Sequence, residues 1–377
     1  MKKNICKPDY DRSILSISSS IMKNYGIESE YKSLIELDDI LKNNYKNVIF
    51  LILDGLGTEI LKKNLPNNSF LRKNVITSIT SVFPSTTAAA TIALHSGKSP
   101  LENGWIGWMP YFKEYNRMIE LFSGKDFYTR EKIMEKPENG CLKYQTIYEK
   151  ICELNKEIKY HKIFPSRIVE NGATTFEDLC EKIEESCNNK SKNLISAYWH
   201  EPDHSIHHNG TDSKIVKNVL KNIDENIKKL KNNLLESIII ITADHGATDV
   251  EEVYINEIKE IDECLALPPS IESRFVSFFI KKGMKTKFKN AIRKNFKGKY
   301  TLYTKKQFLK EGLLGRGTPH KRIDEYLGDY ILISNSNLNI RYSISGEKDS
   351  KHLADHGGIT KEEMMVPLIV VTCNKDS

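Results

Sequence analysis

The chain has 377 residues, of which 39% are hydrophobic and 28% are charged, and its formal net charge is +6. This composition is typical of a soluble globular protein with a full core, in two ordinary domains or in one large domain with an insertion. The 56 basic and 50 acidic residues are mixed along the chain. Because the positive excess is small and dispersed, it does not by itself indicate nucleic-acid binding, and we expect no stable nucleic-acid complex.

Cysteine usage and the N-terminal residues indicate the compartment. The seven cysteines form no CxxC pair; they are Cys6, Cys141, Cys152, Cys180, Cys187, Cys264 and Cys373. An odd, unclustered set favours free thiols in a reducing compartment. The opening MKKNICKPDYDRSIL lacks the apolar run of a signal peptide, and no stretch approaches the roughly 18 apolar residues of a membrane span. We therefore expect a cytoplasmic protein without a membrane interaction, and its oligomeric state stays open.

The first regular segments are a strand and a helix. NVIFLIL (47–53) is a near-continuous β-branched run that ends at Asp54. Such runs are typical of strands buried on both faces of a parallel sheet. TTAAATIALH (86–95) is an alanine-rich run that favours a helix. Residues 110–190 are more charged and less regular, and we predict no arrangement for them.

Two further strands flank a long helix. The strands are ISAYW (195–199) and ESIIIITA (236–243), and the second again ends at an acidic residue. Between them, Asp212 predicts the N-cap of a helix that ends near Leu234. The apolar residues expected to share its inner face are Ile215, Val219, Ile223, Ile227 and Leu230.

Residues 255–350 have a different pattern, which predicts an inserted cap subdomain with a smaller α/β arrangement. Its segments are FVSFFIKKG (275–283), a lysine-rich helix (284–297), TKKQFLKEGLLG (304–315) and YILISN (330–335). VPLIVVT (366–372) then returns to the earlier strand pattern. Strands that alternate with helices predict an α/β core with a mostly parallel sheet, here residues 1–254 and 351–377.

The sequence Ala-Asp-His-Gly occurs twice, at 243–246 and at 354–357. The flanks differ and no period of about 20–50 residues recurs, so this is not a repeat architecture. Two distant loops could instead bring Asp and His side chains to one point. Five polar segments belong to the same group: LDGLG (53–57), FPSTTAAAT (83–91), EPDHSIHHNG (201–210), ADHGATD (243–249) and ADHGG (354–358).

Each of these segments also has an ordinary interpretation. Asp54-Gly55 alone favours a turn, and Ser85-Thr86 alone favours a helix N-cap. His204, His207 and His208 could belong to a solvated loop. Taken together, however, carboxylates and imidazoles in this number are ligands typical of divalent metals such as zinc.

The spacing allows two three-ligand sets. Asp203 and His207, four residues apart, can meet on one helical face, and His356 can complete their set. The second set would be Asp54, Asp244 and His245. Two metals about 3.5–4 Å apart clamp the attacking and leaving oxygens in phosphoryl transfer. A threonine hydroxyl at the start of the alanine-rich helix could bind such a metal and attack, because a helix N-terminus also favours a phosphate.

The ordered set of motifs resembles the alkaline phosphatase superfamily, and most closely its nucleotide pyrophosphatase/phosphodiesterase branch. The matching pieces span residues 47–372 and are DG after the first strand, FPS-x-T, GKSP-x-x-NG, D-x-x-x-H-x-x-G, ADHG, and HGG followed by EEMMVPLIV. The resemblance implies a three-layer core with a cap. It implies that Thr87 is the nucleophile and a metal ligand, while Thr86 is structural or supporting. It also implies two divalent ions, Zn²⁺ or alternatively Mn²⁺, held by the two sets above, with Asp355 outside the ligand shell.

One departure concerns substrate binding. The branch usually carries an asparagine that donates to a phosphate oxygen, and Trp108 stands near that place. Another donor would have to supply the bond, or the reaction differs. Trp105, Trp108 and Tyr111 could form an aromatic wall for a base, or they could equally be core or cap-interface residues.

The expected function is a two-metal hydrolase of phosphodiester or pyrophosphate bonds. It would act on a small anionic ester, nucleotide-like in kind, through a covalent phosphothreonine. A phosphomonoesterase, sulfatase or phosphonate hydrolase of the same superfamily is the alternative, and a metal-dependent phosphoglycerate mutase fits less well. A binding module that keeps the fold without turnover is the hypothesis from a different class.

Overall fold

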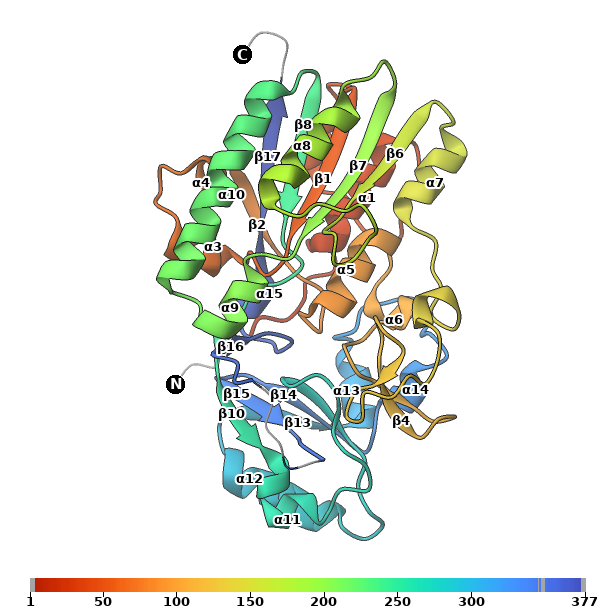
Figure 1. Cartoon of the computed structure of the whole chain (residues 1–377). Coiled ribbons are helices and arrows are strands. Elements are labelled where there is room, and N and C mark those ends of the chain that lie inside the picture. Colours follow the sequence, from red (N-terminus) through yellow and green to blue (C-terminus); the bar gives the residue numbers. More distant parts are fainter. Residues whose placement is uncertain (1–3, 345, 347–349, 374–377) are drawn as a thin grey trace.

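Six strands form one sheet in the order β2-β17-β8-β1-β7-β6 (Figure 1). The computed structural model describes residues 4–344, 346 and 350–373. Strands β6, β7, β1 and β8 run parallel, while β17 is antiparallel to both of its neighbours. The strands are β1 (Asn47–Leu53), β2 (Val75–Thr80), β6 (Ile158–Ile163), β7 (Lys192–Trp199), β8 (Ser237–Thr242) and β17 (Met365–Cys373). The predicted α/β class and mainly parallel sheet are confirmed.

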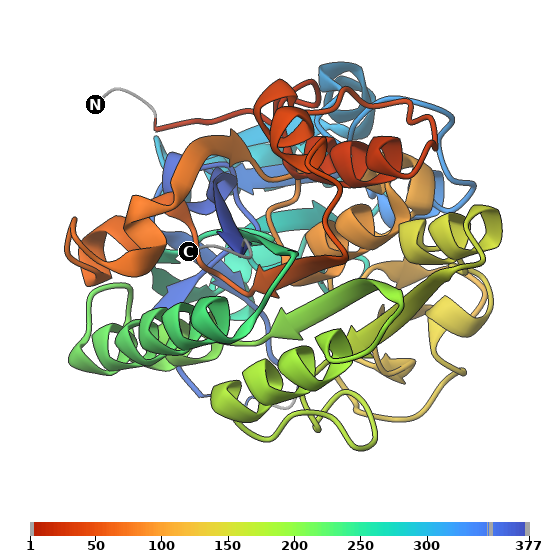
Figure 2. The same cartoon turned by 90° about the horizontal axis from the view of Figure 1, so that it is seen from above.

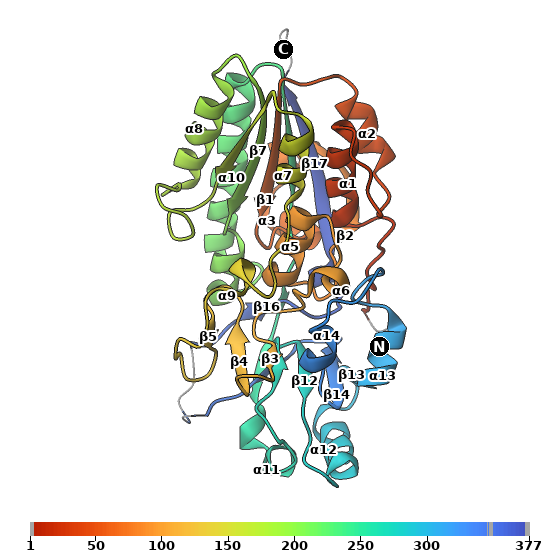
Figure 3. The same ribbon diagram turned by 90° about the vertical axis from the view of Figure 1, so that its right-hand side faces the viewer.

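Helices cover both faces of this sheet, so the core has three layers (Figures 2 and 3). One face carries α1 (Ile14–Asn24) and α2 (Ile35–Leu41), and the other carries α8 (Phe176–Cys187) and α10 (Lys214–Asn233). The remaining helices of the lobe are α3 (Thr58–Asn64), α4 (Phe70–Lys73), α5 (Thr87–Ser96), α6 (Pro100–Asn103), α7 (Ile147–Leu154), α9 (Asp203–Asn209) and α15 (Lys361–Met364). Among the described residues, no helix has the length and apolar character needed to span a membrane.

Helix α10 differs from its prediction in register and in its cap. Ser213, not Asp212, is the N-cap, and its hydroxyl accepts a hydrogen bond from the Val216 amide. Ile215 is 50% exposed, whereas Val216 and Leu220 are buried. The buried stripe continues through Ile223, Ile227 and Leu230, as predicted. Ile215 lies one position beside that stripe, so its apolar side chain faces solvent.

A smaller lobe lies beyond the carboxyl ends of the parallel strands (Figure 1). Its four-stranded antiparallel sheet has the order β11 (Ser270–Ile271), β12 (Phe275–Phe278), β14 (Tyr330–Ser334) and β13 (Tyr300–Thr304). Its helices are α11 (Lys259–Asp262), α12 (Lys285–Phe296), α13 (Lys305–Glu311) and α14 (Ile323–Tyr326). β10 (Glu251–Tyr254) and β15 (Leu338–Arg341) pair in parallel beside it. These elements agree with a second α/β pattern in this part of the chain.

Part of the segment without a predicted arrangement packs on this lobe. β3 (Tyr111–Phe112), β4 (Arg117–Glu120) and β5 (Lys125–Asp126) form a small antiparallel sheet. Phe112 belongs to one apolar cluster with Phe275 and Tyr326 of the smaller lobe. The division into a core and a 255–350 cap stays a proposal. Within these two predicted units, residues 1–3, 345, 347–349 and 374–377 lie outside the part of the chain that the structure describes.

A buried ion pair joins the two lobes. Arg274, just before β12, is fully buried, and its Nε and Nη2 donate to the two carboxylate oxygens of Glu363 in α15, at 2.6 and 2.9 Å. Two further guanidinium N–H groups donate to the carbonyls of Leu338 and Ser336, at 2.8 Å each. Glu363 in turn accepts from the Gly358 amide at 2.7 Å. Four hydrogen bonds from Arg274 and further bonds to Glu363 thus compensate the loss of water around the two buried charges.

Removing one partner of this pair should destabilise the protein strongly. Arg274→Met leaves the Glu363 carboxylate buried without its counter-charge, which costs about 3–5 kcal/mol of unfolding free energy. Urea denaturation should show a large fall in the midpoint. The control is Lys287→Met, which removes an exposed pair with Glu263 and should leave the midpoint unchanged, because exposed pairs contribute little. Equal effects of the two variants would contradict the role assigned to Arg274.

Candidate active site

The acidic residues of the site follow three neighbouring strands. β8, β1 and β7 are adjacent in the sheet, and Asp244, Asp54 and Asp203 follow their respective carboxyl ends. Because these ends lie at one edge of a parallel sheet, the three side chains converge there. All three are buried.

Close approach of two of these segments requires a glycine. Gly55 has φ +72°, and a Cβ on it would lie 2.8 Å from the Asp203 Cβ. Its amide donates to Asp244 Oδ1 at 3.1 Å. Any larger residue would combine a strained backbone with a clash, so Asp54-Gly55 is more than an ordinary turn.

The two Ala-Asp-His-Gly copies meet at this edge. β16 (Ala354–Asp355) pairs antiparallel with β9 (Thr248–Asp249), a few residues beyond the first copy. The rings of His245 and His356 stack with centroids 3.8 Å apart. The prediction that two distant loops would bring their Asp and His side chains together agrees with this geometry.

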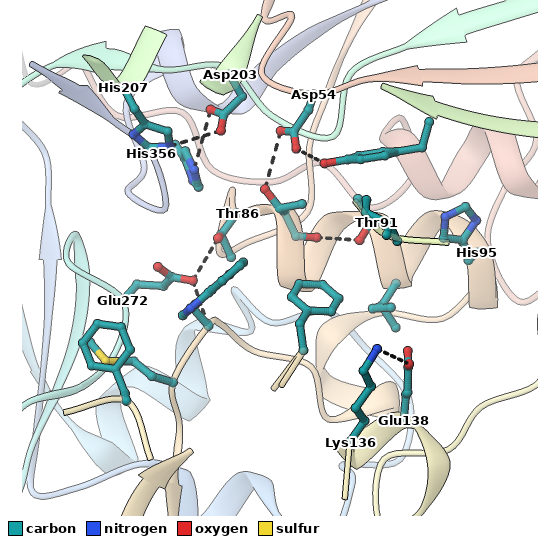
Figure 4. A pocket seen from close by; sticks show the side chains of 18 of the residues that line it. Asp54, Thr86, Thr91, His95, Lys136, Glu138, Asp203, His207, Glu272 and His356 are labelled. Carbon is teal, nitrogen blue, oxygen red and sulfur yellow. Dashed lines mark hydrogen bonds and ion pairs between the residues drawn. The ribbon is translucent and has the colours of Figure 1, made fainter. Parts of the chain in front are cut away.

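The first proposed ligand set is assembled. His207 Nε2 lies 3.1 Å from Asp203 Oδ2, and His356 Nε2 lies 3.8 Å from Asp203 Oδ1. One ligand atom from each of the three residues falls within 4.8 Å of the others. Figure 4 shows the three side chains together on one side of the cavity.

The second proposed set lies directly beside the first. His245 Nε2 is 3.4 Å from Asp54 Oδ1 and 3.5 Å from Asp244 Oδ2. Asp54, His245 and Asp203 also bring ligand atoms within 4.8 Å of one another. Asp203 therefore lies between the two sets.

The donor atoms fit divalent metals. The Nδ1–H groups of His207 and His245 donate to the carbonyls of Ala354 and Gly246, both at 3.0 Å, which leaves Nε2 free as a ligand. Metal-binding histidines are oriented in this way in proteins generally. Asp203 Oδ1 and Asp244 Oδ2 are buried and have no hydrogen-bond partner among the described residues. Carboxylate oxygens left unbonded in a buried site are those a cation would satisfy.

The pKa values of the three buried aspartates show how unfavourable several negative charges are in this site. Burial, with Asp244 and Asp203 nearby, raises the pKa of Asp54 well above its usual value. Burial also raises the pKa of Asp244 to about 7. Burial would raise the pKa of Asp203 too, but His207 and His356 hold it well below its usual range. Two carboxylates of the site thus resist ionisation until a cation is present.

Thr87 is placed beside the second set. It is the first residue of α5, and its Oγ1 lies 3.1 Å from His245 Nε2 and 3.5 Å from Asp54 Oδ1. Thr86 is the N-cap residue but makes no side-chain capping bond. Its hydroxyl instead donates to Glu272 at 2.8 Å. The expected capping role of Thr86 is therefore replaced by a contact with the smaller lobe.

Thr86 and Thr87 open into a cavity of about 750 Å³ that runs between the lobes. Trp108 lines it, whereas Trp105 does not appear among its described lining residues. Trp105 is fully buried, and its Nε1 donates to the Leu142 carbonyl. Trp105 is therefore a core residue and not part of an aromatic wall of the cavity, whereas Trp108 does line the cavity.

Comparisons with known proteins agree with this geometry. Residues 48–358 match the model of the family described as type I phosphodiesterase / nucleotide pyrophosphatase. The chain belongs to this family. A stretch of 112 residues is 36% identical to human ectonucleotide pyrophosphatase/phosphodiesterase family member 5, and it spans 28% of this chain and 24% of that protein. Family membership supports a phosphoester hydrolase.

Solved structures of two kinds of hydrolase-family protein share the fold. Murine ectonucleotide pyrophosphatase/phosphodiesterase 5, in an inactive form with AMP, is 20% identical with a TM-score of 0.63, over 85% of this chain and 87% of that one. Phosphonoacetate hydrolase from Sinorhizobium meliloti 1021, with phosphonoformate, is 14% identical with a TM-score of 0.61, over 87% and 90%. Both support the alkaline-phosphatase-like architecture.

Two polar residues of this phosphodiesterase-family site are not evident from the sequence motifs. Tyr198, inside β7, donates its hydroxyl to Asp54 Oδ2. Glu272, in the β11–β12 turn, binds Thr86. The sequence hints at Tyr198 only through its place, because it is the second-to-last residue of a buried strand that ends at the site. An isolated glutamate after a two-residue strand carries no such signal.

The two histidines near the second Ala-Asp-His-Gly copy give a test of the ligand sets. His356→Ala should lower the bound metal content and the activity, because it removes one of three ligands. His352, whose Nδ1 lies 3.3 Å from Asp355 Oδ2, also lines the cavity, and His352→Ala should be mild. Metal analysis after dialysis and circular dichroism would separate metal loss from unfolding. Equal metal loss in both variants would contradict the assignment of His356.

Proposed function

We propose that the chain is a two-metal hydrolase of phosphodiester or pyrophosphate bonds that acts through a phosphothreonine on Thr87. The observation that carries this proposal is the position of Thr87 Oγ1, within 3.5 Å of both Asp54 and His245 and open to the cavity. The inactive murine relative bound to AMP is a threonine-to-alanine variant, which agrees with a threonine nucleophile.

The residues imply two steps. In the first, the Thr87 Oγ–P bond forms as the bond from phosphorus to the leaving oxygen breaks; the leaving oxygen takes the bonding electrons, and the proton that Thr87 gives up passes through solvent to that oxygen. In the second, water attacks phosphorus, the Oγ–P bond breaks, and a proton from the attacking water returns to Thr87 Oγ, which restores the hydroxyl and releases the phosphoryl product. Two bound divalent ions, Zn²⁺ or Mn²⁺, would supply the positive charge that favours the alkoxide and the attacked phosphorus. Asp203, His207 and His356 would hold one ion, and Asp54, Asp244 and His245 the other.

A nucleotide-like ester suits the cavity. Its volume, about 750 Å³, is in the range of sites that enclose an organic ligand. Aromatic side chains dominate the wall away from the ligand sets; they include Trp108, Phe122, Tyr144, Tyr148, Tyr160 and Phe164. Aromatic surfaces can stack on a nucleobase. The binding of AMP by the murine relative supports the same class.

The compartment and partners are part of the proposal. All seven cysteines are free, which agrees with a reducing, cytoplasmic environment. The substrate would be a small anionic ester rather than a nucleic acid or a membrane surface.

A substrate panel tests the function. Metal-free protein reconstituted with zinc or manganese should hydrolyse phosphodiesters and nucleoside triphosphates faster than phosphomonoesters, sulfate esters or phosphonates. A preference for phosphonates would favour the alternative suggested by the phosphonoacetate hydrolase fold. A protein that binds no metal and stays inert would favour a binding module.

The nucleophile can be assigned by mass spectrometry of enzyme quenched during turnover. Wild type should carry a phosphoryl or nucleotidyl adduct on the peptide that contains Thr87. Thr87→Ala should lose the adduct and several orders of magnitude of turnover, because it removes the attacking oxygen. Thr87→Ser should retain reduced activity, since the hydroxyl remains but the methyl no longer restricts its rotamer.

Thr86→Ala is the matched control for this experiment. It should keep the adduct and lose much less turnover. An adduct that persists in Thr87→Ala and disappears in Thr86→Ala would move the nucleophile by one residue.

A further inference from the structure

Three histidines outside the proposed ligand sets lie close together at the exposed face of α9. His204 and His208 are four residues apart in this helix, so their side chains share one face, and both are exposed. His207 lies between them in the sequence, but its Nε2 faces Asp203 Oδ2 at 3.1 Å. The third member, His352, precedes β16, and its ring meets the ring of His208 edge to face. We call His204, His208 and His352 the outer histidines.

The spacing of the outer histidines fits ligands of one metal ion. Zinc binds an imidazole nitrogen at about 2.0–2.1 Å, which places the ion about 3.2 Å from the ring centroid. Two imidazoles in a tetrahedral site therefore have centroids about 5.2 Å apart. The centroids of His204 and His208 are 5.3 Å apart, and those of His208 and His352 are 5.9 Å apart. Because the helical pair is exposed, small side-chain rotations can close the second separation.

His352 is oriented as metal-binding histidines are. Its Nδ1 lies 3.3 Å from Asp355 Oδ2, so an Nδ1–H group donates to this carboxylate and leaves Nε2 free as a ligand. Carboxylates commonly orient metal-binding histidines in this way. The same Asp355 oxygen accepts from Asn339 Nδ2 at 2.9 Å, which holds the carboxylate in place. Asp355 lies outside both proposed ligand sets, and orienting His352 gives it a role.

Backbone contacts fix His352 relative to α9. The amide of Leu353, the next residue, donates to the His207 carbonyl at 2.8 Å, and the Leu353 carbonyl accepts from the Val250 amide at 3.0 Å. The His352 amide donates to Glu252 Oε1 at 3.1 Å. Figures 1 and 3 accordingly show β16 against α9. Two of the three imidazoles thus share one helix, and the third lies on a segment that is bonded to that helix.

The outer histidines differ in chemistry from the two buried ligand sets. They offer three imidazole nitrogens and no carboxylate, whereas each buried set includes at least one aspartate. Imidazole suits zinc, nickel and copper, while manganese, magnesium and calcium prefer oxygen ligands. The outer histidines should therefore bind ions of the first group and discriminate against manganese.

One other grouping of nearby side chains shares a residue with the first ligand set. His207, His352 and Asp355 also bring ligand atoms within 4.8 Å of one another. However, the Nδ1–H of His207 donates to the Ala354 carbonyl and its Nε2 faces Asp203. Neither nitrogen of His207 is left for a further ion, whereas the outer histidines use no atom of the first set.

We propose that His204, His208 and His352 form a separate metal site that binds one divalent zinc, nickel or copper ion at the margin of the cavity. His352 lines the cavity, whereas His204 and His208 are not among its described lining residues. The His352 ring lies 4.5 Å from that of His207, so the site borders the first ligand set without sharing a ligand. Water would fill the remaining coordination positions, since the helical pair is exposed. This inference goes beyond the proposed function and does not depend on it.

Nickel binding to the zinc-loaded full chain tests the site. The protein is loaded with zinc, dialysed so that only tightly held ions remain, and titrated with Ni²⁺ by calorimetry. Wild type should bind one Ni²⁺ per chain without releasing zinc, and Mn²⁺ should give no comparable binding. His204→Asn, His208→Asn and His352→Asn should each weaken the Ni²⁺ affinity at least about tenfold, because losing a ligand costs no less than losing a group that orients one.

Two control variants separate the site from unspecific binding by surface histidines. His161→Asn removes a histidine of the edge strand β6, whose Nε2 lies 3.2 Å from Asn193 Oδ1, and it should keep the wild-type affinity. A double variant, His208→Asn with Asn209→His, keeps the number of histidines but moves one imidazole off the shared helical face. It should bind Ni²⁺ as weakly as His208→Asn. Circular dichroism and urea midpoints show whether each variant is folded.

Several outcomes would overturn the proposal. Unchanged Ni²⁺ affinity in the three single variants would exclude the outer histidines as ligands, and uptake matched by zinc release would assign the ion to the buried sets. Wild-type affinity in the double variant would show that the number of histidines matters rather than their spacing. Equal binding of Mn²⁺ and Ni²⁺ would contradict a site made of imidazoles. Because the readout is Ni²⁺ binding, each outcome can be read even if the protein hydrolyses no phosphodiester.

Discussion

The crowding of buried carboxylates at one sheet edge is the constraint on which the rest of the site depends. Asp54, Asp203, Asp244 and Asp355 are all buried there, and like charges in a medium of low polarity repel strongly. The protein answers in two ways. Histidines lower the pKa of Asp203 and Asp355 despite their burial, whereas the pKa values of Asp54 and Asp244 are raised. The negative charge of the second pair therefore has to be balanced by protons or by cations, and a metal bound there would link occupancy of the site to its charge state.

One turn of the smaller lobe holds this arrangement together. Glu272, Ser273 and Arg274 are consecutive, and each meets a different part of the site. Glu272 binds the threonine segment, Ser273 Oγ donates to Asp355 Oδ2 at 3.3 Å, and Arg274 binds Glu363. Because the last contact is fully buried and bidentate, the turn has little freedom to move. These three contacts tie the smaller lobe to the loops that carry the proposed site residues, although none of the proposed metal ligands belongs to that turn.

The sequence predicted the parts of the site that lie at the ends of buried strands. Continuous β-branched runs located β1 and β8 within a residue, and the acids after them converge because adjacent parallel strands end together. The prediction placed Ile215 on the buried face of α10, but this residue is exposed. From the sequence alone, an apolar residue next to the buried face cannot be distinguished from one that belongs to it. Glu272 could not be predicted, because its role comes from a contact between lobes rather than from spacing. Its two hydrogen-bond partners, the Thr86 hydroxyl and the Trp108 amide, lie far from it in the sequence.

The proposed catalytic residues and the aromatic wall of the cavity come from different parts of the chain. The proposed metal ligands and Thr87 follow strands or begin helices of the three-layer core, where the sheet fixes their spacing. The aromatic wall comes largely from the edge of the sheet and the segment before it, where Tyr148 of α7 and Tyr160 of β6 stack with centroids 4.9 Å apart. Beyond them, Lys162 lies over the Phe164 ring at the cavity wall. Since these walls contribute no proposed metal ligand, substitutions there would change which ligand the cavity accepts without disturbing the proposed ligand sets or Thr87.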